Sequence, residues 1–354
     1  MMKKIFTILV FSFFAQVING QIGADDAFEF LNVAPSARAT SLGGMYISVF
    51  DDDPNSGVQN PALYNKMMHR QMSFGNVSYL AKTNFGNLAY VHHFDSLFTL
   101  GLDVQFANYG KFTQTDPTAA ILGEFSGSDL LFNLGLARQQ DKISYGINLK
   151  AINSSIENFN AFALAMDLGA VYYNPEKEFT FSLVFKNIGG QLTTYSGEEK
   201  EGTPFDIQLG VSKKLKYLPL RVSIQAHNLN NWDIRYDDPN LQETGTLFGA
   251  DTIQKNYIAD KIFRHLVFGG EFYFGKRVRV RVGYNHLRRQ EAKLEDVGGL
   301  LGYTFGIGIN ANRFKVDYGR ANFNFTGIGA NHLTLTLDLA KFSLPKFKKK
   351  KKDE

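Results

Sequence analysis

A serine beside a histidine is the pair of residue types that would give this chain hydrolytic chemistry. Ser223 and His227 fall on the same face of an alternating segment, and Asn228 follows, as in a Ser-His-Asn lipase. Both side chains face the predicted interior, away from a lipid substrate. The chain also contains no GxSxG turn and no HExxH motif. We therefore predict that the protein is not an enzyme, with a lipid hydrolase as the hypothesis to test.

Two further groups have side chains that ligate metal ions in other proteins. His92 and His93 are adjacent in an expected strand, so they point to opposite faces and cannot bind one ion from there. Asp51–Asp53 and Asn55 offer clustered oxygens for Ca²⁺, but without the EF-hand spacing and its bidentate glutamate. We interpret the acidic segment as a solvent-exposed turn and predict no metal ion and no cofactor.

Composition narrows the class of protein. The chain has 354 residues, and its 38 basic residues nearly balance 34 acidic ones, which argues against a nucleic-acid-binding protein. Hydrophobic residues make up 44%, so the chain is not intrinsically disordered. The absence of cysteine excludes a disulfide framework, a thiolate metal site and a thiol nucleophile. The many aromatic residues and 33 glycines favour an all-β protein.

The N-terminal segment resembles an export signal. Lys3 and Lys4 precede an apolar stretch over 5–14, and small or polar residues follow up to Gly20. The apolar stretch is too short to span a bilayer. We predict a signal peptide over 1–20, with a buried N-terminal helix as the alternative.

The opposite end is basic. Residues 343–354 contain six lysines followed by Asp353 and Glu354, whereas the preceding mature chain is nearly neutral. We predict a basic periplasmic tail over 343–354. It either stays solvated or contacts anionic phospholipid headgroups or an acidic partner.

Alternation with a period of two dominates the body of the chain. Over 98–107, large apolar residues alternate with small or polar ones, which places the two sets on opposite faces of a strand. Most such segments have the length of a strand that crosses a bilayer at a tilt. Fourteen of them lie at 71–79, 84–94, 97–109, 123–139, 143–152, 162–173, 179–189, 205–215, 220–229, 265–274, 278–285, 300–310, 314–322 and 330–341.

The connections between these segments alternate in length after the first hairpin. Short ones lie at 95–96, 140–142, 174–178, 216–219, 275–277 and 311–313, and longer ones at 110–122, 153–161, 190–204, 230–264, 286–299 and 323–329. Outer-membrane barrels have tight periplasmic turns and longer outward loops. We predict an all-β fold, an antiparallel transmembrane β-barrel of about 14 strands in the outer membrane, with both termini periplasmic and loops at the cell surface. A soluble β-sandwich or propeller is the alternative.

The lumen of such a barrel has to be polar and filled. Inward positions carry charges of both signs, which can pair across the lumen: Asp103, Lys150, Asp167, Lys186, Glu271, Arg279 and Arg281. Residues 21–70 alternate weakly and are rich in small residues, so we predict an N-terminal plug there, inside a barrel formed by 71–342. Glycines over 298–308 alternate with apolar residues and mark positions where the plug approaches the wall closely.

The longest outward connection, 230–264, is the surface that we expect to bind a partner. Aromatic residues and arginine on exposed loops are typical of protein interfaces. The candidate contact residues are Trp232, Arg235, Tyr236, Leu247 and Phe248, with Tyr195 of another outward connection. The alternative is that the loop folds over the mouth of the barrel as a lid.

Several short motifs together resemble one family of outer-membrane barrels. Those of the N-terminal segment include Ser36, Ala37, Arg38, Gly43, Gly44, Asn60 and Pro61. They resemble the signature of the PorV/PorQ family of the type IX secretion system of Bacteroidetes, and the stretches 85–94 and 101–112 resemble its PorQ-like branch. The resemblance implies a fourteen-stranded barrel similar to the fatty-acid transporter FadL, with these signature residues in the plug.

The resemblance also implies a function without catalysis. Proteins of the PorQ-like branch anchor a PorZ-like surface subunit. They belong to an attachment complex with a PorU-like sortase and a PorV-like barrel, which joins secreted cargo to lipopolysaccharide. The same role is implied for this chain. The architecture leaves one alternative, a FadL-like channel for hydrophobic or small solutes.

Overall fold

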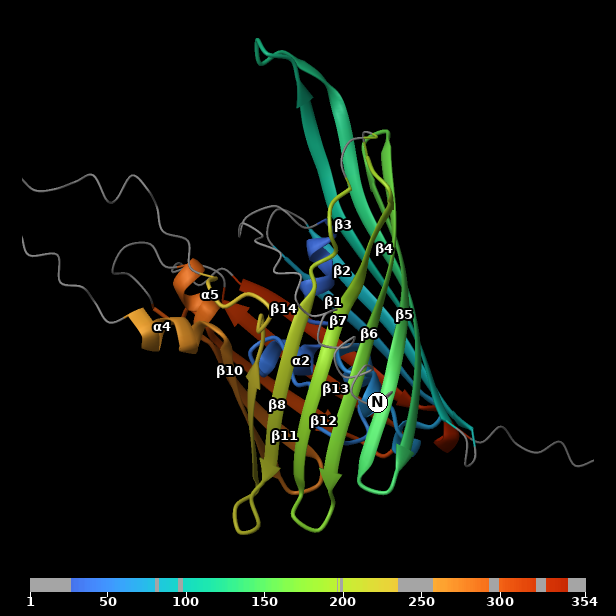
Figure 1. The fold of residues 1–354 in the computed structure, drawn as a ribbon, viewed down its shortest axis with the longest axis vertical. Coiled ribbons are helices and arrows are strands. Elements are labelled where there is room, and N and C mark those ends of the chain that lie inside the picture. The colour runs from blue at the N-terminus through green and yellow to red at the C-terminus, as the bar shows by residue number, and fades with distance from the viewer. Residues whose placement is uncertain are drawn as a thin grey trace, which may run out of the picture.

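The computed structural model describes residues 27–79, 83–94, 98–195, 197, 200–234, 257–292, 299–322 and 329–342. Within these ranges, fourteen strands form one closed antiparallel barrel in which consecutive strands are neighbours (Figure 1). The last strand pairs with the first, from Gln71↔Asp338 to Ser78↔Asn331. The predicted all-β barrel is therefore confirmed. The predicted signal peptide (1–20) and basic tail (343–354) lie outside the described residues.

The strands follow the predicted segments closely. Their bounds are β1 (Gln71–Ser78), β2 (Asn84–Phe94), β3 (Phe98–Thr115), β4 (Ile121–Gln140), β5 (Ile143–Ile156), β6 (Phe159–Asn174), β7 (Phe179–Thr193), β8 (Asp206–Lys214), β9 (Leu220–Ala226), β10 (Leu266–Phe274), β11 (Val278–Asn285), β12 (Tyr303–Asn310), β13 (Phe314–Asn322) and β14 (Gly329–Asp338). Helices α4 (Tyr257–Arg264) and α5 (His286–Glu291) precede β10 and follow β11, and η6 (Leu339–Lys341) follows β14. Across the described ranges, every helix is too short or too polar to traverse a bilayer.

The two faces of the wall differ in chemistry. On β3 the outward Leu102 and Phe106 are exposed, whereas the inward Asp103 and Ala107 are buried. Exposed apolar side chains continue around the outer face and include Phe132, Leu164, Ile224, Phe305 and Leu333. A soluble sandwich or propeller does not present so wide an apolar surface to water. The fold is that of a membrane-spanning barrel, since only a closed sheet pairs all its backbone groups in lipid.

The two ends of the barrel are unequal. The tight turns lie at one end, at the bottom of Figure 1 for β4–β5, β6–β7 and β8–β9. The start of β1 and the end of β14 lie at that same end, because the strand number is even and neighbours are antiparallel. The opposite end carries α4, α5 and the β3–β4 hairpin, which rises farthest (Figure 1). We call this second end the outer rim.

Two connections that the sequence predicts as loops are largely strand. β3 reaches Thr115 and β4 starts at Ile121, so most of 110–122 is hairpin. Likewise, the connection predicted at 153–161 is only a turn between β5 and β6. The prediction at 110–122 is wrong because the period-two pattern fades where both faces of a strand meet water. A β-bulge between Asn108 and Lys111 also interrupts the alternation. At 153–161 one face stays buried, at Ser154 and Ala161, and the two strands simply continue closer to the turn than predicted.

Replacing an outward leucine on β4 tests which part of that strand lies in lipid. Leu134→Arg should destabilise the protein by about 2–4 kcal/mol, because the arginine has to enter hydrocarbon. Leu122→Arg, on the same strand but in the hairpin beyond the ring, should leave stability nearly unchanged. Unfolding by guanidinium chloride in phospholipid vesicles measures both. Equal losses in the two variants would contradict this placement of the strand.

Candidate functional site

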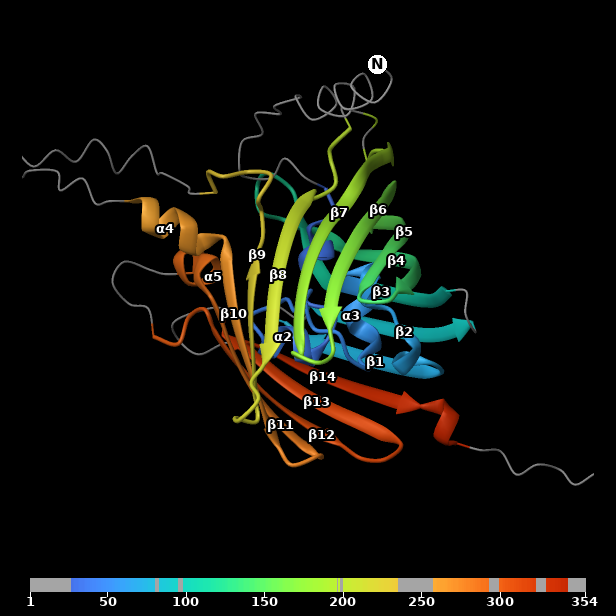
Figure 2. The ribbon, with the colours of Figure 1, turned by 60° about the horizontal axis from the view of Figure 1, so that its bottom comes forward.

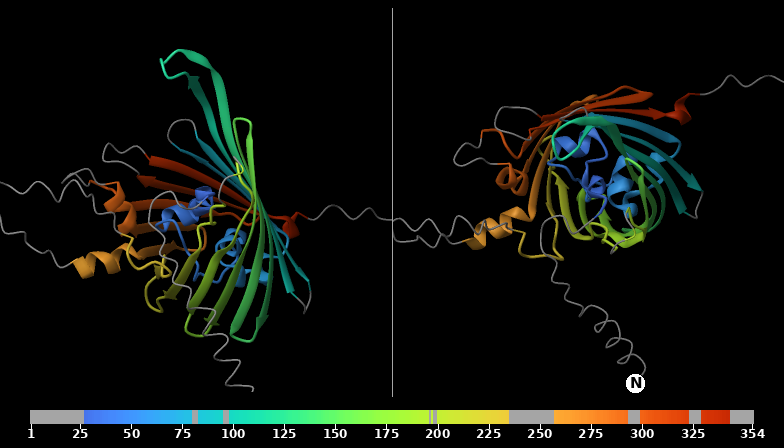
Figure 3. Two further views of the ribbon diagram at one scale, coloured as in Figure 1. Left: turned by 45° about the horizontal axis from the view of Figure 1, so that its top comes forward. Right: turned by 90° about the horizontal axis from the view of Figure 1, so that it is seen from above.

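Residues 27–70, which we call the plug, lie inside the barrel (Figures 2 and 3). They form five short helices: η1 (Glu29–Asn32), α2 (Ala37–Ser41), α3 (Pro54–Gln59), η2 (Pro61–Leu63) and η3 (Lys66–Met68). All residues of α2, α3 and η2 are buried. The plug therefore fills space that the side chains of a barrel this wide do not fill.

Polar capping residues start the short helices of the plug. Ser36 accepts a hydrogen bond from the Ala39 N–H at 3.2 Å and begins α2. Asn60 accepts one from the Ala62 N–H at 3.0 Å, with Pro61 at the first position of η2. Such caps supply local stability to helices that are too short to form alone. Three of the signature residues, Ser36, Asn60 and Pro61, thus set the local folding of the plug.

The signature glycines make the turn that follows α2. Gly43 and Gly44 have φ angles of +89° and +107°, which residues with a Cβ rarely adopt. The Gly43 N–H donates to the Oγ1 of Thr304 on β12 at 3.0 Å. A Cβ on Gly44 would lie 2.7 Å from the guanidinium of Arg288 in α5. A Cβ on Gly43 would lie 2.4 Å from the Cγ1 of Val267 on β10, so the turn needs glycine for its conformation and, at Gly43, for its contact with the wall.

Inward-facing glycines of the wall let the plug approach the strands. A Cβ on Gly319 would lie 2.2 Å from the carbonyl oxygen of Ala37. One on Gly306 would lie 2.4 Å from the Cβ of Ser41. The prediction that glycines over 298–308 mark close approach of the plug is confirmed at Gly306.

Arg38 is the centre of a buried charge cluster between the plug and the wall. Its guanidinium lies 2.7 Å from the carboxylate of Asp51, 3.3 Å from that of Asp53 and 2.9 Å from that of Glu271 on β10. Asp51 also contacts Arg221 of β9 at 3.1 Å. Buried ions are tolerated only when they are paired and hydrogen-bonded. The cluster therefore ties the plug to two adjacent strands.

The interpretation of Asp51–Asp53 as a solvent-exposed turn is wrong. The turn lies in the lumen, where Asp52 pairs with Lys315 of β13 at 2.5 Å. Burial alone raises the pKa of the Asp51 carboxyl, but the charges of Arg38 and Arg221 outweigh burial and hold that pKa well below its usual range. The protein's own cations thus neutralise these carboxylates, so the oxygens are not an open Ca²⁺ site.

Charges on the inner face of the wall also pair with each other. The Nζ of Lys150 lies 2.7 Å from the carboxylate of Asp167 on the neighbouring strand. Arg281 lies 3.3 Å from Glu271 and 2.5 Å from Asp317. Opposite charges on the inner face therefore pair as predicted, but they do so between adjacent or next-nearest strands and not across the lumen.

Ser223 and His227 lie on the inner face but do not form a catalytic pair. The Ser223 hydroxyl donates to the Gly269 carbonyl at 3.4 Å, and the backbone N–H of His227 donates to the His265 carbonyl at 3.0 Å. Both Ser223 and His227 are buried. This geometry gives the hydrolase hypothesis no support, because the Ser223 hydroxyl donates to a backbone carbonyl and, within the described residues, to no histidine ring.

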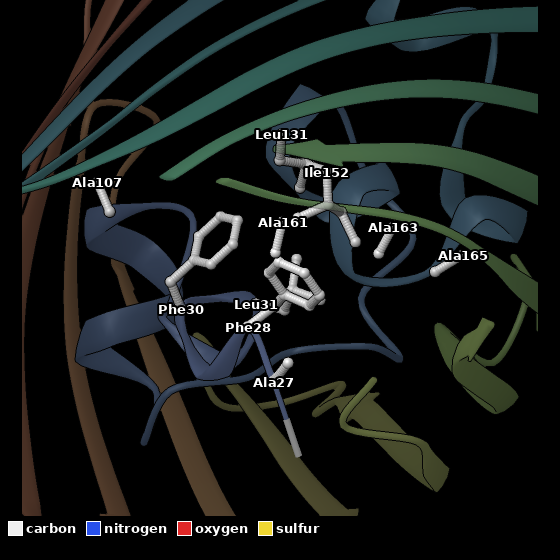
Figure 4. Packing of buried hydrophobic residues seen from close by; sticks show 10 residues of the cluster. All are labelled: Ala27, Phe28, Phe30, Leu31, Ala107, Leu131, Ile152, Ala161, Ala163 and Ala165. Carbon is white, nitrogen blue, oxygen red and sulfur yellow. The ribbon is translucent and has the colours of Figure 1, made fainter. Parts of the chain in front are cut away.

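The structure describes Trp232 and Tyr195 among the predicted partner-contact residues. Trp232 is 55% exposed and stacks on His265 with ring centroids 4.8 Å apart. The Tyr195 hydroxyl donates to the Oγ of Ser154 at 2.6 Å. Its ring packs against the apolar cluster that contains Phe28 of the plug, shown in Figure 4. Arg235, Tyr236, Leu247 and Phe248 lie outside the described residues.

The β3–β4 hairpin continues beyond the ring as a two-stranded ribbon (Figure 1). β2 pairs with β3 only as far as Asn108, and β5 pairs with β4 only from Gly127 onward. Residues 109–126, which we call the ribbon, therefore have no flanking strand in the described part of the chain. Such an edge is a surface on which another chain can add a strand.

Apolar side chains gather on the ribbon. Phe112 and Phe125 stack across it with ring centroids 5.3 Å apart. Ile121 and Leu122, close to its tip, are 74% and 64% exposed. This surface is not among the residues predicted to bind a partner, because the sequence pattern predicts a loop over 110–122. The available signal was the pair of apolar residues directly after the turn at 116–120.

A small pocket opens between the plug and β1–β3. Apolar side chains of the plug and of the wall line it and include Phe30, Val33, Pro35, Val77 and Phe85. The cavity measures about 20 Å³, which is room for a water molecule and not for an organic solute.

The fold and the filled lumen define a plugged, membrane-spanning β-barrel. No family model and no curated protein matches the chain. Among solved structures, it is similar to a FadL homologue of Pseudomonas aeruginosa, with 10% identity over 86% of this chain and 98% of that chain, and a TM-score of 0.47. It is also similar to the toluene transporter TodX of Pseudomonas putida, with 11% identity over 86% of this chain and 97% of that chain, and a TM-score of 0.47. The class of protein follows from this barrel's own strand order and faces.

Removing the guanidinium at the centre of the charge cluster should loosen the plug. Arg38→Met leaves Asp51 and Glu271 without their shared partner, although Arg221 and Arg281 still pair with them. The expected cost is therefore at or below the low end of the about 3–5 kcal/mol that an uncompensated buried charge causes. Hydrogen exchange of the backbone amides of α2, compared with those of the strands, measures the effect.

The control is Lys111→Met, which removes an exposed ion pair with Glu124 on the ribbon and should leave exchange in α2 unchanged. If α2 stays equally protected in Arg38→Met, the cluster does not hold the plug.

Proposed function

We propose that the protein is an outer-membrane anchor that presents its outer rim to a partner protein at the cell surface. The observation that carries this proposal is the ribbon, a strand pair that extends beyond the ring with exposed apolar side chains at Ile121 and Leu122. Such side chains are unfavourable in water and typical of a surface that a partner covers. The filled lumen supports the proposal, because a plugged barrel serves as a scaffold without being a conduit.

The resemblance to the PorV/PorQ family supports a finer assignment. On this proposal the partner is a PorZ-like surface subunit, held in one attachment complex with a PorU-like sortase and a PorV-like barrel. The complex processes secreted cargo and joins it to lipopolysaccharide. Exposed Trp232 at the outer rim provides a second contact for the partner, in addition to the ribbon.

Shortening the ribbon tests the proposal. Replacing residues 111–126 by Asn-Gly joins β3 to β4 near the ring with a tight turn. The barrel should still assemble, since its ring contacts remain. The PorZ-like subunit should move from the membrane fraction to the medium, as measured by quantitative blotting and by co-purification in mild detergent.

The matched control is Lys111→Gln, which alters the charge of the ribbon and keeps its apolar residues; it should retain the partner. Normal retention of the partner by the shortened protein, with the barrel folded, would count against the ribbon as its contact surface.

A second candidate function is a channel for hydrophobic or small solutes, and the apolar pocket between the plug and β1–β3 marks a place where a path could open. The cavity is too small for a solute, so passage would require the plug to move.

We expect vesicles that contain the purified protein to be impermeable to small solutes in a swelling assay, and Arg38→Met to raise their permeability. Solute entry through the unmodified protein would favour the channel over the anchor.

A further inference from the structure

The polar side of helix α4 faces the protein. Asp260 lies 2.9 Å from His286 of α5, and Lys261 lies 2.8 Å from Asp233. Asp260 also pairs with Arg264 one helical turn away, at 2.7 Å. The charged residues of α4 are therefore committed to ion pairs with their neighbours at the outer rim.

The apolar side of α4 faces away from the protein. Ile258 is 69% exposed, Ile262 41% and Phe263 45%. A helix on the surface of a soluble protein has the opposite arrangement, because its apolar side packs on the core and its polar side meets water. The reversed arrangement indicates that the exposed apolar side of α4 is covered by an apolar environment.

The apolar side of α4 continues the outer face of the barrel. The ring centroid of Phe263 lies 6.3 Å from that of Phe268 on β10 and 5.9 Å from that of His286. The ring of His286 lies 6.0 Å from that of Tyr284, which in turn lies 4.8 Å from that of Tyr303. Phe268, Tyr284 and Tyr303 occupy outward positions of β10, β11 and β12.

The position of α4 fits this continuity. Seen from above, α4 lies outside the ring of strands and not over its mouth (Figure 3). The helix thus extends sideways from the rim, at the level where the lipid-facing surface of β10–β12 ends. The contact between the rings of Phe263 and Phe268 joins the two surfaces.

We propose that α4 is an interfacial helix that lies in the outer leaflet, with Ile258, Ile262 and Phe263 directed into the acyl chains. We infer that lipid covers the apolar side of α4, because this side is continuous with the outer face of β10–β12, which is itself in lipid. The ion pairs of Asp260 and Lys261 hold the helix at the rim. Interfacial helices of this kind insert their apolar side about 5–10 Å into the boundary between headgroups and acyl chains.

A single tryptophan placed on α4 tests the proposal. The chain contains one tryptophan, and Trp232→Phe removes it while keeping a ring beside His265. In that background we would compare Ile262→Trp with Phe305→Trp on the outer face of β12 and Thr118→Trp at the tip of the ribbon. Each protein is reconstituted in phosphatidylcholine vesicles whose acyl chains carry bromine near the headgroup, which quenches only tryptophans that touch lipid.

We expect bromolipid quenching of Ile262→Trp within about two-fold of that of Phe305→Trp, and little quenching of Thr118→Trp. Acrylamide in the aqueous phase should quench in the reverse order. Quenching of the Phe305→Trp protein verifies that the barrel has inserted.

Two results would overturn the proposal. If acrylamide quenches Ile262→Trp as strongly as Thr118→Trp, the apolar side of α4 is open to water and available to a protein partner. If neither quencher reaches Ile262→Trp, another part of the chain covers it.

Discussion

Closure of the ring by pairing of β14 with β1 is the constraint on which the other features of the structure depend. Hydrocarbon offers no hydrogen-bond partner, so each unpaired backbone group there costs several kcal/mol. A closed ring removes both edges of the sheet. It also requires one face of every strand to be apolar, and the even number of antiparallel strands brings the start of β1 and the end of β14 to the same end of the barrel.

Closure also creates the interior that the plug occupies. A ring of fourteen strands is too wide for its own side chains to fill, so a polar interior needs either water or another segment of the chain. In this protein the plug fills it, and glycines such as Gly306 and Gly319 allow backbone to approach backbone. The carboxylates of Asp51 and Glu271 stay in the interior because Arg38 pairs with both, and Arg221 and Arg281 each pair with one of them.

Beyond the ring of strands the backbone no longer has to pair all its polar groups within the sheet. The two surfaces that we propose to bind a partner or lipid, the ribbon and α4, lie there. The ribbon exposes both edges of a strand pair, and α4 turns its apolar side outward. Neither arrangement would persist in a protein that needed only to be a soluble, compact domain, because both leave apolar surface uncovered. The two proposals account for these surfaces: a partner chain covers the ribbon, and lipid covers the apolar side of α4.

The wall of the barrel could be predicted residue by residue. In 98–107, as in the other strands, successive side chains point to opposite faces, whichever strands lie beside them. The alternation of apolar with small or polar residues therefore indicates which side chains face the lipid and which face the lumen. The lengths of the connections indicated which end carries the tight turns. The largest failure came at the ribbon, where that pattern stops, because a strand with water on both faces has no alternation to read.

The sequence by itself therefore determined the class of fold, the outward and inward side chains of the wall and the presence of an N-terminal segment unlike the strands. Only the tertiary structure decided what the inner residues do. Asp51 meets Arg221 across 170 residues of chain, and Asp52 meets Lys315 across 263. Such pairs have no local signature, because they form only when the closed ring brings distant strands around the plug.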